Sequence, residues 1–215
     1  MPARTGLLLS VTNYNNMKFI LGKKIAMTQI FAEDGTVTPV TLIEAGPMTV
    51  TQIKNQEKDG YSSVQVGYGK TKKTNKAKSG HLKDLGNLIT LKEFQADQEL
   101  KRGDVIDASI FEEGDTVKVS GVSSGKGFTG AVKRHGFHGM PASHGHHHVL
   151  RHVGSIGQRF PQHTLKGMRM AGHMGNVRVT TRGLKIMKID RENNLIAVRG
   201  AVPGRRGTLL EIVEI

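Results

Sequence analysis

The chain has 215 residues, and its 31 Lys and Arg against 18 Asp and Glu give a formal net charge of +13. This length allows one sizeable core, or a core with an appendage, and the basic balance predicts a polyanionic partner. The absence of cysteine excludes disulfides, zinc–thiolate sites and thiol catalysis, and because no apolar run approaches the ~18 residues of a membrane span we expect no membrane contact.

Residues 1–16 show neither a strand pattern nor a secretory signal. Their apolar run, residues 6–11, is too short for a signal peptide, and the polar residues 13–16 follow it without a cleavage pattern. We expect a disordered N-terminal extension, or an upstream start assigned in place of Met17. A cleaved organelle transit peptide is a weaker alternative, because the segment holds a single arginine, Arg4.

From residue 18 onward the sequence alternates in the manner of short β-strands. Residues 18–21 and 25–31 are predicted strands on either side of a break at 22–24, and residues 32–35 form a turn. Turn signals also occur at 45–47 and 57–60. The predicted strands between these signals are rich in β-branched residues and cover residues 36–44, 49–54 and 63–68.

The middle of the chain is less regular. Residues 70–79 are basic and poor in apolar side chains, which predicts a mobile loop that touches RNA. We expect residues 80–103 to be irregular, with a short helix around 81–85. Two further strands are predicted at 104–111 and 116–122.

The C-terminal end returns to a strand pattern. Strands are predicted at 183–189, 195–199 and 208–215, with a turn at 190–194. Many short strands with turn signals between them favour a β-barrel. We therefore predict a mainly β protein.

The predicted barrel combines both ends of the chain. It takes residues 17–122 and 174–215, and residues 123–173 form a long, basic, glycine-rich loop inserted between barrel strands.

The positive charge is concentrated in one segment. Residues 116–189 contain 12 Lys and Arg and not one Asp or Glu, whereas the rest of the chain has 19 Lys and Arg against 18 carboxylates. A segment without acidic residues must obtain its counter-charge elsewhere, and phosphate is the usual source. The alternative is a basic loop that is only solvated, but a net charge of this size is typical of a nucleic-acid surface.

A glycine pattern in this segment resembles a nucleotide-binding motif. Residues 125–130 match G-x-G-x-x-G, but a dinucleotide site also needs a carboxylate about 20 residues later, and the next one is Asp190. A Walker loop is excluded because Gly127, rather than Ser or Thr, follows Lys126. The pattern then predicts a glycine turn whose amides and lysine face phosphate.

Nine of the ten histidines lie between His135 and His173. Imidazole is a common zinc ligand, so a metal-binding protein or metal-dependent enzyme that uses the cluster from His144 to His152 is one hypothesis. No carboxylate is nearby to orient the rings, and the many cations disfavour a dication. We therefore favour RNA contact by the histidines and predict no metal and no cofactor.

The sequence offers little for catalysis. Ser143 and Ser155 have neighbouring histidines, but the segment has no acid to complete a triad. We predict that the protein is not an enzyme and has no small-molecule substrate. A free translation or DNA-binding factor built on a similar barrel is a second alternative.

The residues expected to contact RNA combine basic side chains and histidines from the barrel and from the inserted segment. They are Lys23, Lys24, Lys72, Lys73, Lys126, Lys133, Arg134, His144, His148, Arg151, Arg159, Lys166, Arg169, His173, Arg178 and Arg182.

Six blocks of the sequence carry a resemblance to a known family. They are residues 17–35 (MKFILGKKIAMTQIFAEDG), 121–137 (GVSSGKGFTGAVKRHGF), 143–145, 154–158, 166–176 (KGMRMAGHMGN) and 200–204 (GAVPG). In order and spacing, from Met17 to Ile215, the chain resembles the bacterial-type large-subunit ribosomal protein L3 family.

The resemblance implies a split β-barrel of the translation-protein type with a long central extension. It also implies a structural protein of the large ribosomal subunit, in the cytoplasm, that binds 23S-type rRNA near its 3′ end and helps to start subunit assembly. The extension would run toward the peptidyl transferase centre. The implied protein neighbours are the ribosomal proteins numbered fourteen and nineteen, and no homo-oligomer is expected.

Overall fold

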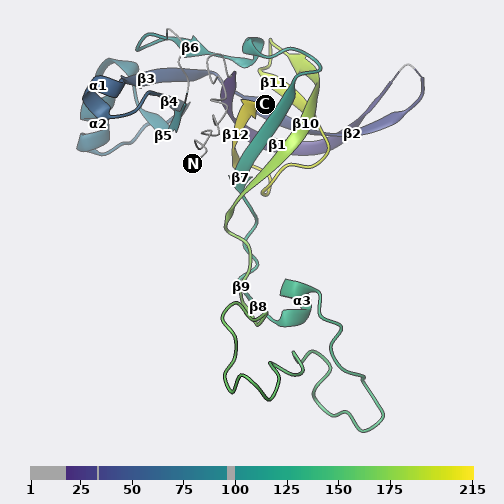
Figure 1. Ribbon diagram of the computed structural model, residues 1–215. Helices are drawn as coiled ribbons and strands as arrows, with labels where there is room; N and C mark the ends of the chain where they lie inside the picture. Colours follow the sequence, from purple (N-terminus) through teal and green to yellow (C-terminus); the bar gives the residue numbers. More distant parts are fainter. Residues whose placement is uncertain (1–17, 33, 96–99) are drawn as a thin grey trace, which may run out of the picture. The chain divides into compact units, whose positions relative to one another are not determined.

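We describe the protein from a computed structural model that covers residues 18–32, 34–95 and 100–215 (Figure 1). The chain divides into two compact units. The barrel unit comprises residues up to 121 together with 180–215, and the inserted unit comprises residues 122–179. The expectations for residues 1–16, for Glu33 in the predicted turn, and for 96–99 within the irregular segment lie outside the described residues.

Six strands form a closed barrel in the order β1-β12-β7-β10-β11-β2 (Figure 1). They are β1 (Phe19–Phe31), β2 (Val37–Ala45), β7 (Thr116–Val122), β10 (Arg178–Asp190), β11 (Leu195–Arg199) and β12 (Leu209–Glu214). The N-terminal hairpin of β1 and β2 therefore pairs on its two sides with the C-terminal strands β12 and β11. This arrangement confirms the prediction of a mainly β protein whose barrel is built from both ends of the chain.

The predicted break at residues 22–24 is wrong, because β1 runs through it. A Cβ placed on Gly22 would lie 2.7 Å from the carbonyl oxygen of Glu44 on the paired strand. Glycine is needed here for a close backbone approach inside the sheet, and the sequence pattern mistook it for a turn signal. The only irregularity is a β-bulge between Lys24 and Ala26.

A second, four-stranded sheet has the order β5-β4-β3-β6. Its strands are β3 (Met48–Lys54), β4 (Ser63–Lys70), β5 (Leu88–Phe94) and β6 (Val105–Ile106). Residues 17–122 therefore do not all enter the barrel, contrary to expectation. β5 lies in the segment expected to be irregular, and the strand predicted at 104–111 is reduced to β6 and the 3₁₀ turn η2 (Ala108–Ile110).

Helices in the barrel unit are short. They are α1 (Gln56–Asp59), α2 (Lys76–Leu82) and the 3₁₀ turn η1 (Lys83–Leu85). The expected loop at 70–79 is replaced by helix from Lys76 onward, because the Asn75 side chain caps α2 by accepting a hydrogen bond from the backbone N–H of Lys78 at 2.9 Å.

The barrel and the four-stranded sheet share one hydrophobic core. Phe19 of β1 stacks on Phe94 of β5 with ring centroids 4.6 Å apart. Fully buried side chains from barrel strands, such as Ile43 and Leu210, belong to the same cluster as Val66 of the second sheet. The barrel unit therefore has a continuous core.

The inserted unit is held together mainly by backbone hydrogen bonds. It contains β8 (Phe128–Thr129), which pairs with β9 (Gly172–His173), and the helix α3 (Ala131–His135). Paired hydrogen bonds between residues 123–127 and 174–177 extend this two-stranded ribbon. Only Thr129 and Ala131 are buried among residues 122–179, so this unit has almost no core of its own.

Candidate nucleic-acid interface

The inserted unit cannot neutralise its own charge. Residues 122–179 include eight Lys and Arg and nine histidines but no Asp or Glu. In the barrel unit, by contrast, lysines find carboxylates: the Lys18 Nζ lies 3.0 Å from Asp115, and the Lys92 Nζ lies 3.0 Å from Glu211. A unit without carboxylates draws counter-charge from outside itself, and phosphate is the usual source.

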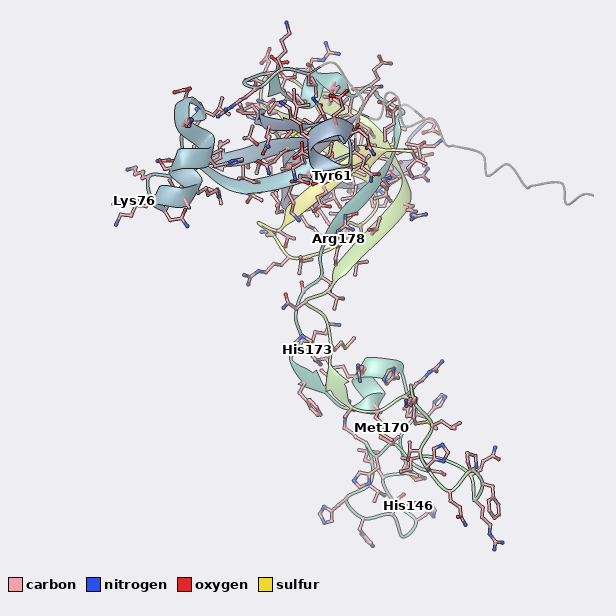
Figure 2. The ribbon with its side chains drawn as sticks, turned by 60° about the vertical axis from the view of Figure 1, so that its left-hand side comes forward. Tyr61, Lys76, His146, Met170, His173 and Arg178 are labelled. Carbon is pink, nitrogen blue, oxygen red and sulfur yellow. The ribbon has the colours of Figure 1, made fainter. Side chains whose placement is uncertain are left out.

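Most of these cations are presented to the outside. Seven of the eight Lys and Arg are exposed: Lys126, Lys133, Arg151, Arg159, Lys166, Arg169 and Arg178. The predicted contact residues His144, His148 and His173 are exposed as well. Figure 2 shows how the side chains of this unit point outward around His146, Met170 and His173. Such a surface can meet phosphates at many points.

The inserted unit also exposes large apolar side chains. Phe128 is 80% exposed and Phe160 is 64% exposed, and the Arg159 guanidinium lies 5.8 Å from the centre of the Phe160 ring. Aromatic rings and guanidinium planes are the groups on which unpaired bases stack. The sequence interpretation missed both phenylalanines, although aromatic residues in a segment without acidic residues were a usable signal.

One predicted contact residue, Arg134, has a role inside the unit. Its Nη1 donates to the carbonyl oxygen of Met170 at 2.8 Å, and the His135 ring nitrogen lies 3.1 Å from the same oxygen. A Cβ on Gly172 would lie 2.5 Å from the Arg134 Nη1. Arg134 is half-buried and joins α3 to the chain before β9, whereas its neighbour Lys133 is exposed.

Glycine permits two close backbone approaches in this unit. A Cβ on Gly175 would lie 2.1 Å from the carbonyl oxygen of Ser124, and a Cβ on Gly139 would lie 2.1 Å from that of Leu150. Both glycines also have positive φ, 77° and 79° respectively. These two positions therefore accept no side chain without a shift of the backbone.

A hollow of about 630 Å³ lies within the inserted unit. Its walls include Ala131, Met140 and Val153, with Arg151 and His152 among the polar residues. Three or more metal-ligating side chains do not gather in this hollow or anywhere else in the described part of the chain. The arrangement thus gives no support to the metal hypothesis.

In the barrel unit, Lys24 is bound by its own chain. Its Nζ donates to the carbonyl oxygens of Val202 at 2.9 Å and Gly204 at 3.1 Å, and burial lowers the pKa of this ammonium. Lys24 therefore closes the loop before β12, a role that the sequence interpretation did not foresee. Lys23 lies with its Nζ 5.7 Å from the centre of the Tyr68 ring.

The remaining predicted residues of the barrel unit are exposed. Lys72 and Lys73 lie on the loop before α2, and Arg182 lies on β10.

Across residues 18–32, 34–95 and 100–215, no helix is long and apolar enough to cross a membrane.

Comparison with known proteins identifies the family. The family model described as "Ribosomal protein L3" matches residues 12–199. The chain is 48% identical over 199 residues to the large ribosomal subunit protein uL3 of Herpetosiphon aurantiacus, covering 90% of this chain and 94% of that one. It is 49% identical over 205 residues to uL3 of Chloroherpeton thalassium, covering 92% and 99%. The chain therefore belongs to the ribosomal protein L3 family.

Proposed function

We propose that this protein is a structural constituent of the large ribosomal subunit, and that it binds ribosomal RNA chiefly through the inserted unit. The observation that carries the proposal is the chemistry of residues 122–179. This unit contains eight Lys and Arg and no carboxylate, and only two of its residues are buried. Such a unit gains its counter-charge and its ordered environment when RNA surrounds it. The relatives named as large-subunit proteins support the same role.

The finer parts of the proposal follow from the family resemblance. The chain would bind 23S-type rRNA near its 3′ end, assist the start of subunit assembly and direct residues 123–173 toward the peptidyl transferase centre. Its protein neighbours would be the ribosomal proteins numbered fourteen and nineteen. The protein would work as a ribosome component rather than as an enzyme.

The contacts would be of two kinds. Exposed cations such as Arg151 and Arg169 neutralise phosphates, which fixes position but reads little sequence. Exposed rings such as Phe128 and Phe160 stack on unpaired bases. Recognition would therefore depend mainly on the shape of the RNA and on its unpaired nucleotides.

Sedimentation tests the proposal directly. The tagged full chain should migrate with the large subunit in a sucrose gradient and stay there after a high-salt wash, because many contacts hold it. Release by the wash would instead support a free translation factor. Migration with no ribosomal particle would refute the proposal.

The metal alternative has its own test. Metal analysis of the purified protein should find no stoichiometric zinc or nickel. The opposite result, with loss of the metal after His146, His147 and His148 are changed to alanine, would favour a metal-binding protein.

A further inference from the structure

One part of the barrel unit has the opposite charge character from the inserted unit. Between Ile25 and Ile43 the chain contains no Lys, Arg or His, and its only charged residues are Glu33 and Asp34. These residues span most of the β1–β2 hairpin (Figure 1). A hairpin without cations and with the exposed Asp34 at its turn repels phosphates, so RNA is an unfavourable partner for it.

The outer end of this hairpin is a two-stranded ribbon, in which residues 29–31 of β1 pair with 37–39 of β2. β12 pairs with β1 only from Phe19 to Lys23. β11 pairs with β2 only from Val40, which lies opposite Arg199, to Glu44. Beyond these pairs, the described residues offer only the backbone N–H of Gly200, which donates to the carbonyl oxygen of Pro39 at 2.8 Å. Isolated two-stranded ribbons are marginally stable in water, so a further layer would stabilise this one.

One face of the ribbon is apolar and uncovered. The register places Phe31 opposite Val37, and Met27 opposite Thr41. Because side chains alternate along a strand, Met27, Phe31 and Val37 share a face, with Gln29 and Pro39 between them. They are 50%, 66% and 48% exposed.

The same face becomes the barrel interior at the inner end of the hairpin. Thr41 and Ile43 lie on the same side of β2 as Val37 and Pro39 and are fully buried, and the Thr41 hydroxyl donates to the carbonyl oxygen of Gly200 at 2.6 Å. The apolar face of the ribbon therefore continues a core-type surface beyond the point where the barrel's own core ends. Large apolar side chains in such a place are typical of an interaction surface.

We propose that the face formed by Met27, Phe31 and Val37 is the docking surface for a neighbouring protein of the large subunit. The partner lays an apolar segment on this face and brings Lys or Arg side chains toward the acidic turn. Charge complementarity favours this partner over RNA. The turn attracts cations, and the ribbon has no cationic side chain that could bind a phosphate. The inference rests on the proposed function, since the neighbour is a protein of the same subunit.

Photo-crosslinking in assembled subunits tests the inference. A benzoylphenylalanine placed at Phe31 of the full chain should, after irradiation of salt-washed large subunits, form an adduct with one ribosomal protein identified by its mass. The matched control places it at Thr28, which is exposed on the same strand but on the opposite face, and should give several-fold less of that adduct. An adduct with rRNA, with a second copy of this chain or with its own residues 1–17 would overturn the inference, as would no adduct or equal adducts from both positions.

A paired variant gives a second readout. Phe31→Asp with Val37→Asp should lower the occupancy of the crosslinked neighbour by on the order of tenfold or more, because carboxylates would be buried against an apolar surface. Thr28→Asp with Thr38→Asp introduces the same charge on the other face and should retain the neighbour. Unchanged occupancy in the first variant would refute the docking surface, whereas absence of this chain itself from wild-type subunits would refute the proposed function.

Discussion

Removal of two charges from the inserted unit should change how RNA binding responds to salt. Arg151 and Arg169 are both exposed and have no carboxylate within the unit. We expect Arg151→Gln with Arg169→Gln to weaken binding to large-subunit rRNA and also to flatten its salt dependence. The reason is that a protein with fewer phosphate contacts releases fewer counterions when it binds RNA.

The magnitude follows from the number of exposed cations. Seven exposed Lys and Arg in residues 122–179, each contributing roughly 0.7–0.9, give a slope of log affinity against log salt of roughly −5 to −6. Affinity should then fall by about three to four decades between roughly 50 and 200 mM salt. The double variant should reduce the magnitude of the slope by roughly 1.4–1.8.

The assay is filter binding of the full chain to rRNA over a salt series. Lys54→Gln with Lys92→Gln is the matched control, because it removes the same charge from lysines that are paired with Glu93 and Glu211. Its slope should stay at the wild-type value. An equal change of slope in both variants would show that net charge alone matters, and no change in the first variant would refute the assignment of Arg151 and Arg169 to phosphates.

Three further predictions concern the barrel unit and are measured by thermal or denaturant unfolding. Lys24→Met should destabilise the protein by about 2 kcal/mol, because it removes the two hydrogen bonds that the ammonium donates. It should leave the salt slope of RNA binding unchanged. A changed slope would show that Lys24 contacts RNA after all. Gly22→Ala should lower the free energy of unfolding by about 2–3 kcal/mol, because the new Cβ would meet the Glu44 carbonyl. Gly80→Ala in α2 is the control: this position has open space and an ordinary φ, so the change should stabilise the protein by about 0.5–1 kcal/mol. Similar effects of the two changes would contradict the close approach at Gly22. Lys18→Met should cost about 1 kcal/mol near neutral pH, and this difference from wild type should shrink as the pH falls below about 4.

The sign of the last prediction follows from Asp115. Burial acts to raise the pKa of this carboxyl, but hydrogen bonds from the Glu112 N–H and the Lys18 ammonium outweigh burial and lower it. A lowered pKa in the folded state gives stability that is present above the unfolded pKa and lost as pH falls through the folded one. Because Lys18 contributes to that lowering, its contribution disappears when Asp115 is protonated. A difference that grew at acidic pH would contradict the pairing.

Local pattern predicted some strands well and others poorly. β7 and β11 have the predicted bounds, because each is a short run between turn residues, alternating in β7 and continuously apolar in β11. β5 was missed: Lys92 and Glu93 sit in it, and its two buried ends, Leu88 and Phe94, lie too far apart to show alternation. The assignment of four strands to a separate sheet depends on which strands pair, and pairing is a tertiary property that no single segment carries.

The candidate interface shows the same limit at the level of single residues. The absence of acidic residues from 116–189 predicts a phosphate-facing region, and within it seven of the eight Lys and Arg of residues 122–179 are exposed. Arg134 and Lys24 have the same residue types as their neighbours, but carbonyl oxygens of their own chain bind them. Residue type therefore predicts which segment carries the unbalanced positive charge, whereas local backbone geometry decides which cations within it are available.

The distribution of charge along the chain matches the two proposed partners. The barrel unit has a continuous core, and several of its lysines pair with carboxylates. The inserted unit has cations without anions, and the residues from Ile25 to Ile43 have anions without cations. One surface cannot suit both a phosphate backbone and an acidic apolar ribbon. These charges therefore fit the two neighbours proposed for the chain, a nucleic acid at residues 122–179 and a protein at the β1–β2 hairpin.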